Sequence, residues 1–363
     1  MIEIADVKKA LANLRDPETG QDLIASGRIK DINIRGQYVQ CTMVLPSLQA
    51  TYKESLYQAV QGEIEKQFPD YQVHIHMEVA AAGSTASSPL PHVKNIVAVA
   101  SGKGGVGKST ISVNLALALH KAGWKVGILD ADLYGPSIPT MLDLTHAKPK
   151  VEVIQGAHKL IPLEAYGVPV ISMGFIVEPE QAVVLRGPRL GGIIKQFITD
   201  CLWPPLDILV VDLPPGTGDI QLTLVQSIPV TGAIMVTTPQ QVAVADAIKA
   251  SSMFMLDNVA VPIIGVVENM SWFTPVEMPD KKYYLFGKGG GERLAHYTQS
   301  TLLGKVPLIQ AVQELSDRGK PAALQSDPLL YEPFKHLAEQ TIKQLQVRND
   351  TLKPTEVVRI TTS

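Results

Sequence analysis

The chain has 363 residues, of which 45% are hydrophobic and 18% charged, so it can bury one or two globular cores and general disorder is excluded. Its 32 basic and 35 acidic side chains nearly cancel, and this formal charge of -3 argues against a broad nucleic-acid-binding surface. Only two cysteines occur, Cys41 and Cys201, which excludes a disulfide framework and predicts a reducing, cytoplasmic setting.

The first eighty residues predict a small α+β domain. The opening residues lack the basic flank and apolar core of a secretory signal, and apolar side chains then recur at helical spacing, at Ile4, Val7, Leu11 and Leu14. A turn, two strands, a helix and a last strand follow, at residues 16–20, 28–34, 37–45, 48–68 and 73–79. The predicted order is therefore α-β-β-α-β.

A run of small, polar and proline residues at 80–91 predicts a flexible linker. Beyond it, apolar runs without two-residue alternation indicate strands that are buried on both faces. These runs lie at residues 96–100, 126–129, 208–211, 233–236 and 263–267. They are too short to cross a bilayer, so no stable membrane insertion is expected. The expected parts are a small domain, a linker, a large α/β domain and a polar tail, at residues 1–80, 81–93, 94–348 and 349–363.

A glycine-rich segment, Gly-Lys-Gly-Gly-Val-Gly-Lys-Ser at 102–109, separates the first of these strands from a predicted helix. Its glycines let backbone N–H groups surround phosphate oxygens, Lys108 supplies charge to the outer phosphates, and Ser109 can ligate Mg²⁺. The fold class expected is α/β, a P-loop NTPase with a mostly parallel sheet covered by helices. The predicted ATP-binding residues of this segment are Gly102, Lys103, Gly104, Gly105, Val106, Gly107, Lys108, Ser109 and Thr110.

Carboxylates follow two of the buried strands. Asp130 and Asp132 come after the run at 126–129, and Asp212 ends the run at 208–211. The carboxyl ends of parallel strands share one edge of a sheet, so these groups are expected beside the phosphates, on Mg²⁺ or on the attacking water. Capping of a helix is the simpler interpretation for one aspartate of the 130/132 pair.

Lys103 is not needed to hold the phosphates of its own chain, so it is either a solvated loop lysine or a cation that reaches a nucleotide across a dimer interface. At this point the segment at 103–109 resembles the deviant Walker-A ATPases, whose signature is K-G-G-x-G-K-[ST]. The resemblance implies a homodimer in which Lys103, Lys108 and Asp132 are catalytic, with Asp132 orienting the water. It also implies that Ser109, Asp130 and Asp212 serve Mg²⁺ and that Asn269 reads adenine, although a turn asparagine is an equal alternative.

Four further segments resemble the Mrp/ApbC branch of this group, at residues 132–137, 186–188, 212–219 and 268–271. The front module, with its Asp-Pro-Glu-Thr-Gly turn at 16–20, is similar to the small iron–sulfur assembly domain that precedes such ATPases. The resemblance implies a slow ATPase that carries an iron–sulfur cluster to apoproteins, with ATP, Mg²⁺ and a cluster as cofactors. Its implied partners are a second copy, apo iron–sulfur proteins and assembly factors.

The chain departs from this branch in its cysteines. Many such carriers have a C-x-x-C pair after the Asn-Met-Ser segment, whereas no cysteine follows Cys201 here. Cys41 is expected in the core of the small module, and Cys201 is the candidate ligand that remains, with packing as its simpler role. Two other functions therefore stay open, a nucleotide-switched assembly factor that ligates no cluster and a MinD/ParA-like positioning ATPase.

Overall fold

The computed structural model divides the chain into two compact units, Met1–Ser87 and Ser88–Ser363. It describes residues 2–12, 14–16, 22–24, 26, 28–45, 52–79, 90–132, 135–154, 157–175, 197–198, 200–256 and 259–355. Most of the predicted linker, the Arg-Gly-Pro segment at 186–188, the turn residues at 17–20 and the last eight residues lie outside the described part. In that part, no helix combines the length and the apolar character that spanning a bilayer requires.

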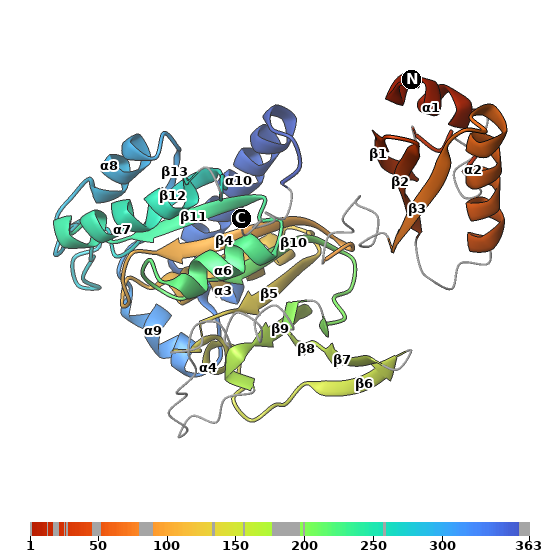
Figure 1. Cartoon of the computed structure of the whole chain (residues 1–363). Helices are drawn as coiled ribbons and strands as arrows, with labels where there is room; N and C mark the ends of the chain where they lie inside the picture. Colours follow the sequence, from red (N-terminus) through yellow and green to blue (C-terminus); the bar gives the residue numbers. More distant parts are fainter. Residues whose placement is uncertain are drawn as a thin grey trace. The chain divides into compact units, whose positions relative to one another are not determined.

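The first unit has the predicted order of elements, with helices on one face of a three-stranded sheet (Figure 1). Strand β2 pairs antiparallel with β1 and parallel with β3. Alternate residues of β2, from Val39 to Leu45, are buried, and Cys41 is one of them, as predicted. The elements are α1 (Ile4–Leu11), β1 (Ile29–Arg35), β2 (Tyr38–Leu45), α2 (Lys53–Gln67) and β3 (Gln72–Val79).

The second unit is built on an eight-stranded sheet in the order β13-β12-β11-β4-β10-β5-β9-β8. Every neighbouring pair is parallel except β8 with β9, which confirms the expected mostly parallel sheet. A separate ribbon pairs β6 (Lys150–Ile154) with β7 (Ala157–Ile161). The strands of the large sheet are β4 (Val93–Ser101), β5 (Val126–Asp130), β8 (Leu163–Ala165), β9 (Val168–Ser172), β10 (Leu206–Asp212), β11 (Gly232–Thr237), β12 (Ile263–Glu268) and β13 (Leu302–Lys305).

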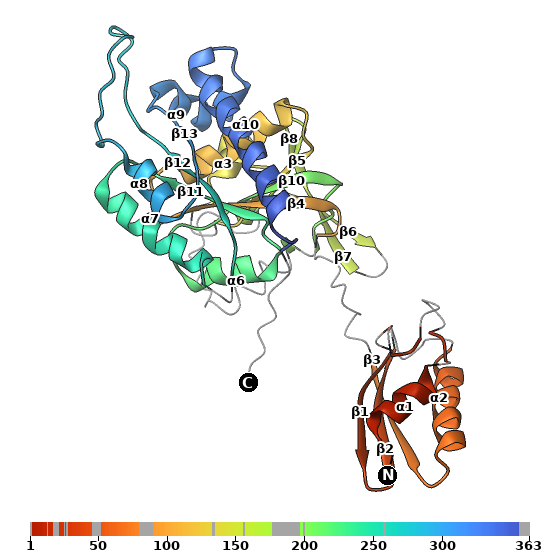
Figure 2. The same cartoon turned by 90° about the horizontal axis from the view of Figure 1, so that it is seen from above.

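Helices cover both faces of this sheet, α3, α9 and α10 on one side and α6, α7 and α8 on the other (Figure 2). Alternate residues of β4 therefore enter opposite cores, with Val97 and Val99 facing α3 and Ala98 and Ala100 facing α7. The helices are α3 (Lys108–Lys121), α4 (Ile138–Met141), α6 (Asp219–Ser227), α7 (Gln241–Phe254), α8 (Gly290–Tyr297), α9 (Gln310–Asp317) and α10 (Pro328–Thr351), with short 3₁₀ turns η1 (Met173–Phe175) and η2 (Ala322–Leu324).

Candidate nucleotide-binding site

The glycine-rich segment forms the loop between β4 and α3. Gly105 and Gly107 adopt φ angles of +79° and +82°, a left-handed conformation that L side chains rarely take. A Cβ placed on Gly104 or Gly105 would meet no atom within 4 Å, so the loop is open to the outside there. Helix α3 starts at Lys108 without a side-chain cap, and its first N–H groups therefore remain available to an anion.

Lys108 lies at the centre of a buried polar cluster, with 6% of its surface exposed. Its Nζ donates to Asp212 Oδ2 at 2.7 Å and lies 3.6 Å from Asp132 Oδ2. Ser109 Oγ donates to the same Asp212 oxygen at 2.6 Å. The predicted catalytic lysine, the predicted Mg²⁺ ligands Ser109 and Asp212, and the predicted catalytic Asp132 are therefore assembled within hydrogen-bonding or ion-pair distance.

Asp212 is completely buried at the end of β10, where it stands directly beside Asp130 of β5 in the sheet register. Its second oxygen accepts a hydrogen bond of 2.6 Å from Ser112 Oγ. Ser112 lies one helical turn after Lys108, and the sequence analysis did not identify it. A serine four residues after the phosphate-loop lysine faces the same side of α3, and this spacing was the signal that could have found it.

Asp130 is also fully buried, and both of its oxygens are held. Ser172 Oγ of β9 donates to Oδ2 at 2.8 Å, and the backbone N–H of Asp132 donates to Oδ1 at 3.1 Å. Burial and the neighbouring Asp212 carboxylate raise the pKa of Asp130 to about 8, against the opposing effects of Ser172 and Lys108. Asp130 thus fixes the start of the loop that carries Asp132. Ser172, from a strand whose pattern gave no functional signal, was missed.

Asn269 follows β12 and is buried against the phosphate loop. Its side-chain Nδ2 donates to the carbonyl of Val106 at 2.8 Å. A Cβ on Gly107 would come within 2.2 Å of the same nitrogen, so only glycine fits there. The amide therefore supports the loop backbone in this structure, and its reading of adenine stays a prediction.

Glu268, the last residue of β12, is a further buried acid, which the sequence placed in the resembling segment at 268–271 without a role of its own. Its carboxylate accepts hydrogen bonds from Ser271 Oγ at 2.5 Å and from the Gly291 N–H at 2.6 Å, and Lys305 Nζ lies 3.9 Å away. It thereby joins both ends of the segment between β12 and α8. An acid at the end of a buried strand, as with Asp212, was the available signal.

Gly102 and Lys103 lie at the start of the loop. A Cβ on Gly102 would come within 2.1 Å of the backbone of Asp246, so this glycine allows α7 to pack closely against the loop. Lys103 is half-buried and makes no ion pair with any residue that the structure describes. Its role across a dimer interface stays a prediction.

The residues expected to serve Mg²⁺ fit that ion in their chemistry. Mg²⁺ prefers carboxylate and hydroxyl oxygens, and Ser109 Oγ and Asp212 Oδ2 already lie 2.6 Å apart. Asp130 is enclosed by protein hydrogen bonds, which favours an indirect role for it behind Asp132. In the described part of the chain, no group of three or more His, Cys, Asp and Glu side chains is arranged to hold a metal ion by itself.

Both cysteines are buried. Cys41 and Cys201 expose 3% and 7% of their surfaces, and burial raises the pKa of their thiols to about 11 and about 12. Thiolates are the form that ligates iron, so this environment disfavours ligation by either residue. Cys201 packs in the core beneath α6 and α7, and its role as a ligand remains an untested prediction.

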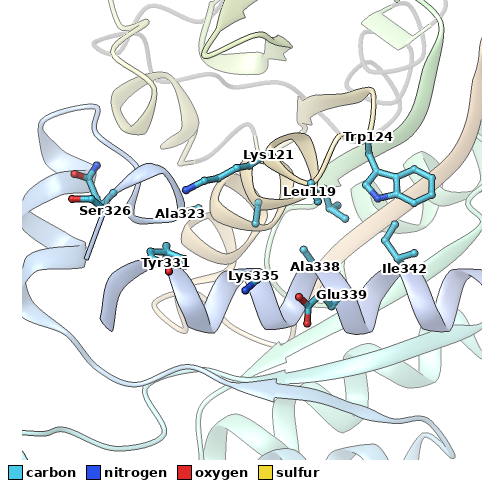
Figure 3. Close-up of a pocket in the computed structure, with 13 residues that line it drawn as sticks. Leu119, Lys121, Trp124, Ala323, Ser326, Tyr331, Lys335, Ala338, Glu339 and Ile342 are labelled. Carbon is cyan, nitrogen blue, oxygen red and sulfur yellow. The ribbon is translucent and has the colours of Figure 1, made fainter. Parts of the chain in front are cut away.

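A cavity of about 750 Å³ lies between α3 and α10 (Figure 3). Trp124 and Ile342 line one end of it, and Lys121 places its Nζ 4.9 Å from the ring centre of Tyr331 toward the other. The cavity is lined by none of the predicted site residues. It touches the last turn of α3, whereas the phosphate loop precedes the first turn of the same helix.

A phosphate loop that leads from a parallel strand into an uncapped helix is the nucleotide-binding element of P-loop NTPases, and the fold and the site define a protein of that class. The chain belongs to the NUBPL iron-transfer P-loop NTPase family, which it matches over residues 92–342. Residues 4–75 match a second family, described as iron-sulfur cluster assembly protein. These matches confirm the resemblance to iron–sulfur carrier ATPases with a preceding assembly domain.

Similar proteins carry related names. The iron-sulfur cluster carrier protein of Synechocystis sp. is 42% identical over 327 residues, which cover 88% of this chain and 91% of that protein. The iron-sulfur cluster transfer protein NUBPL of Dictyostelium discoideum is 43% identical over 260 residues, covering 71% and 79%. Both alignments extend over most of the two chains compared.

Among solved structures, the nucleotide-binding protein of Archaeoglobus fulgidus in complex with ADP is similar with a TM-score of 0.57 and 36% identity, covering 68% of this chain and 94% of that one. The ATP complex of a Cyanothece McdA variant has a TM-score of 0.52 at 17% identity and covers 69% and 96%. The second likeness concerns the fold alone.

Proposed function

We propose that this protein binds ATP with Mg²⁺, hydrolyses it slowly, and uses the nucleotide to switch a homodimer that carries iron–sulfur clusters to apoproteins. The observation that carries the nucleotide part is the buried cluster of Lys108, Ser109 and Asp212 at the foot of an open phosphate loop. The cluster-carrying part is supported by the family and by the names of similar proteins. The proposed compartment is the cytoplasm, as the sequence predicts.

The hydrogen bonds of Lys108 indicate how the site responds to phosphate. In this structure the ammonium group is neutralised by Asp212 and Asp132, which balances a charge that would otherwise be buried alone. A phosphate in the loop offers Lys108 another anionic partner and releases Asp212 and Asp132 from their ion pairs with it. When bound, Mg²⁺ supplies positive charge that stabilises the phosphate oxygens during transfer.

Asp212 and Asp132, once released from Lys108, lie at the ends of different strands, and we assign them different roles. Asp212 stays fixed by Ser112 and Ser109 at the end of β10, where it can hold the shell of the metal. Asp132 lies on the loop after β5, where we assign it the orientation of the attacking water. Lys103 has no ion pair among the described residues, and we assign it to the nucleotide of the second copy.

A second function is favoured by the cysteines. Because both thiols are buried and have raised pKa values, this chain is also suited to act as a nucleotide-switched factor that docks its partners without ligating a cluster itself. A MinD/ParA-like positioning role has less support, since the apolar residues of α10, among them Leu330, Phe334 and Leu337, pack in the core against the sheet and do not form a free membrane-binding face.

The test measures nucleotide binding and association of the purified chain with ATP and Mg²⁺. Lys108→Ala should lose both, whereas Lys103→Ala should keep binding and lose turnover. Association that is the same with and without ATP, or tight ATP binding by Lys108→Ala, would refute the proposal. Anaerobic reconstitution with iron and sulfide then separates the two functions, because a protein that stays colourless is a docking factor.

A further inference from the structure

Strand β3 of the first unit carries two histidines, His74 and His76, in alternate positions. Val73 precedes His74, and Ile75 lies between the two histidines. Both of these apolar residues pack against the hydrophobic core under α1 and α2. Successive side chains of a strand point to opposite faces, so both histidines lie on the outer face of the sheet. Both are exposed to solvent in the structure.

The neighbouring strand continues this outer face with neutral oxygen groups. In the register of β2 with β3, Gln40 stands beside His74 and Thr42 beside His76. Asn33 and Lys30 of β1 come next in the same two rows. Across the sheet, the residues beside the histidine pair are therefore a glutamine and a threonine, and Lys30 lies one strand further in the row of His76.

Two histidines at positions i and i+2 of one strand have their Cα atoms about 6.6 Å apart, twice the rise of about 3.3 Å per residue. Imidazole side chains at this spacing can lean along the strand and place one nitrogen each on a common ion, at about 2.0–2.1 Å for Zn²⁺. Imidazole nitrogen is a preferred ligand of Zn²⁺, Cu²⁺, Ni²⁺ and Fe²⁺. Strand β3 is at the edge of its three-stranded sheet, so no further strand of the described residues pairs with it on that side.

We propose that His74 and His76 form a two-histidine site for a divalent transition-metal ion on the outer face of the first unit, and that Fe²⁺ is the ion it takes. Two protein nitrogens bind the ion, and water completes its coordination, because no third His, Cys, Asp or Glu among the described residues joins the pair. Such an open site binds a metal reversibly and suits the receipt and release of iron. The choice of Fe²⁺ rests on the proposed iron–sulfur function, whereas the site itself does not.

The experiment is anaerobic calorimetric titration of the full chain with Fe²⁺ and, separately, with Zn²⁺, in the absence of nucleotide. The variants are His74→Gln, His76→Gln and the double variant, and the matched control is His158→Gln, a single exposed histidine on strand β7. Loss of a group that only orients a metal ligand weakens affinity about tenfold or more, so each single variant should lose at least that much. The double variant should lose one equivalent of metal, and the control should match the wild type.

A second readout identifies the ligands directly. The electron paramagnetic resonance spectrum of one equivalent of Cu²⁺ should show coupling to two nitrogens in the wild type and in the control, and lose it in the double variant. Because the histidines are exposed, all variants should keep the circular dichroism spectrum of the wild type.

The inference is overturned if the double variant binds as much Fe²⁺ and Zn²⁺, as tightly, as the wild type. Binding of Zn²⁺ without Fe²⁺ would overturn the assignment to iron. ATP-dependent association, measured on the same preparations, keeps the two proposals distinguishable. If ATP-dependent association persists while the histidine variants bind metal like the wild type, only this inference fails. If association does not depend on ATP while the double variant loses metal binding, only the proposed function is refuted.

Discussion

Ser112 offers a direct test of the buried cluster, because its hydroxyl donates a hydrogen bond to a carboxylate and not to a neutral acceptor. Its Oγ donates to Asp212 Oδ1 at 2.6 Å, and both residues are completely buried. A hydrogen bond to a charged partner contributes about 1.5–3 kcal/mol, so Ser112→Ala should lower the free energy of unfolding by about 2 kcal/mol. For a unit of this size, that corresponds to a fall in melting temperature of roughly 4–8 °C.

The assay is thermal and urea unfolding of the full chain without nucleotide, read on the transition of the second unit. The matched control is Ser251→Ala, since Ser251 is equally buried but donates to the neutral carbonyl of Ile248 at 2.8 Å. The control should lose only about 1 kcal/mol. Ser112→Ala should also weaken Mg²⁺-dependent ATP binding, because Asp212 is then less firmly fixed. Equal losses of stability in the two variants would refute the argument that Asp212 is charged and anchored by Ser112.

Three further perturbations test other contacts of the site. Gly102→Ala should destabilise the second unit by about 1–3 kcal/mol in urea unfolding, because the added Cβ would overlap the backbone of Asp246. The control Gly104→Ala has open space around its Cβ and should leave the unfolding midpoint unchanged. Equal midpoints in the two variants would contradict the close packing of α7 on the loop. Asn269→Ala leaves the Val106 carbonyl without its hydrogen-bond donor and should lower the free energy of unfolding by about 1–3 kcal/mol. If Asn269 also reads adenine, the variant should show a smaller preference for ATP over GTP in competition binding. The pKa of Asp130 is raised from 3.8 to about 8, so the folded state holds this proton more tightly than the unfolded state does. The resulting stability is present below about pH 4 and is lost as the pH rises through about 8. Asp130→Asn should therefore flatten the decline of the unfolding midpoint with pH. If the midpoint of the variant declines with pH as steeply as that of the wild type, the decline comes from other groups.

The sequence by itself determined the fold class and the chemistry of the phosphate loop. Uninterrupted apolar runs such as those of β4 and β10 are recognisable because a strand buried on both faces needs apolar side chains at every position. The pattern of glycines before Lys108 is equally local, since the φ angles of Gly105 and Gly107 depend on the residue itself.

Only the tertiary structure decided which distant side chains complete the site. No local pattern distinguishes Ser172, and the local signals at Ser112 and Glu268 do not name the groups that these residues contact. Each gains its role from the acid or amide that the fold brings beside it. The sheet register sets Asp130 next to Asp212, and the raised pKa of Asp130 comes from burial and from that proximity. Hydrogen bonds and charge interactions act over a few ångströms in space, and separation along the chain does not report that distance.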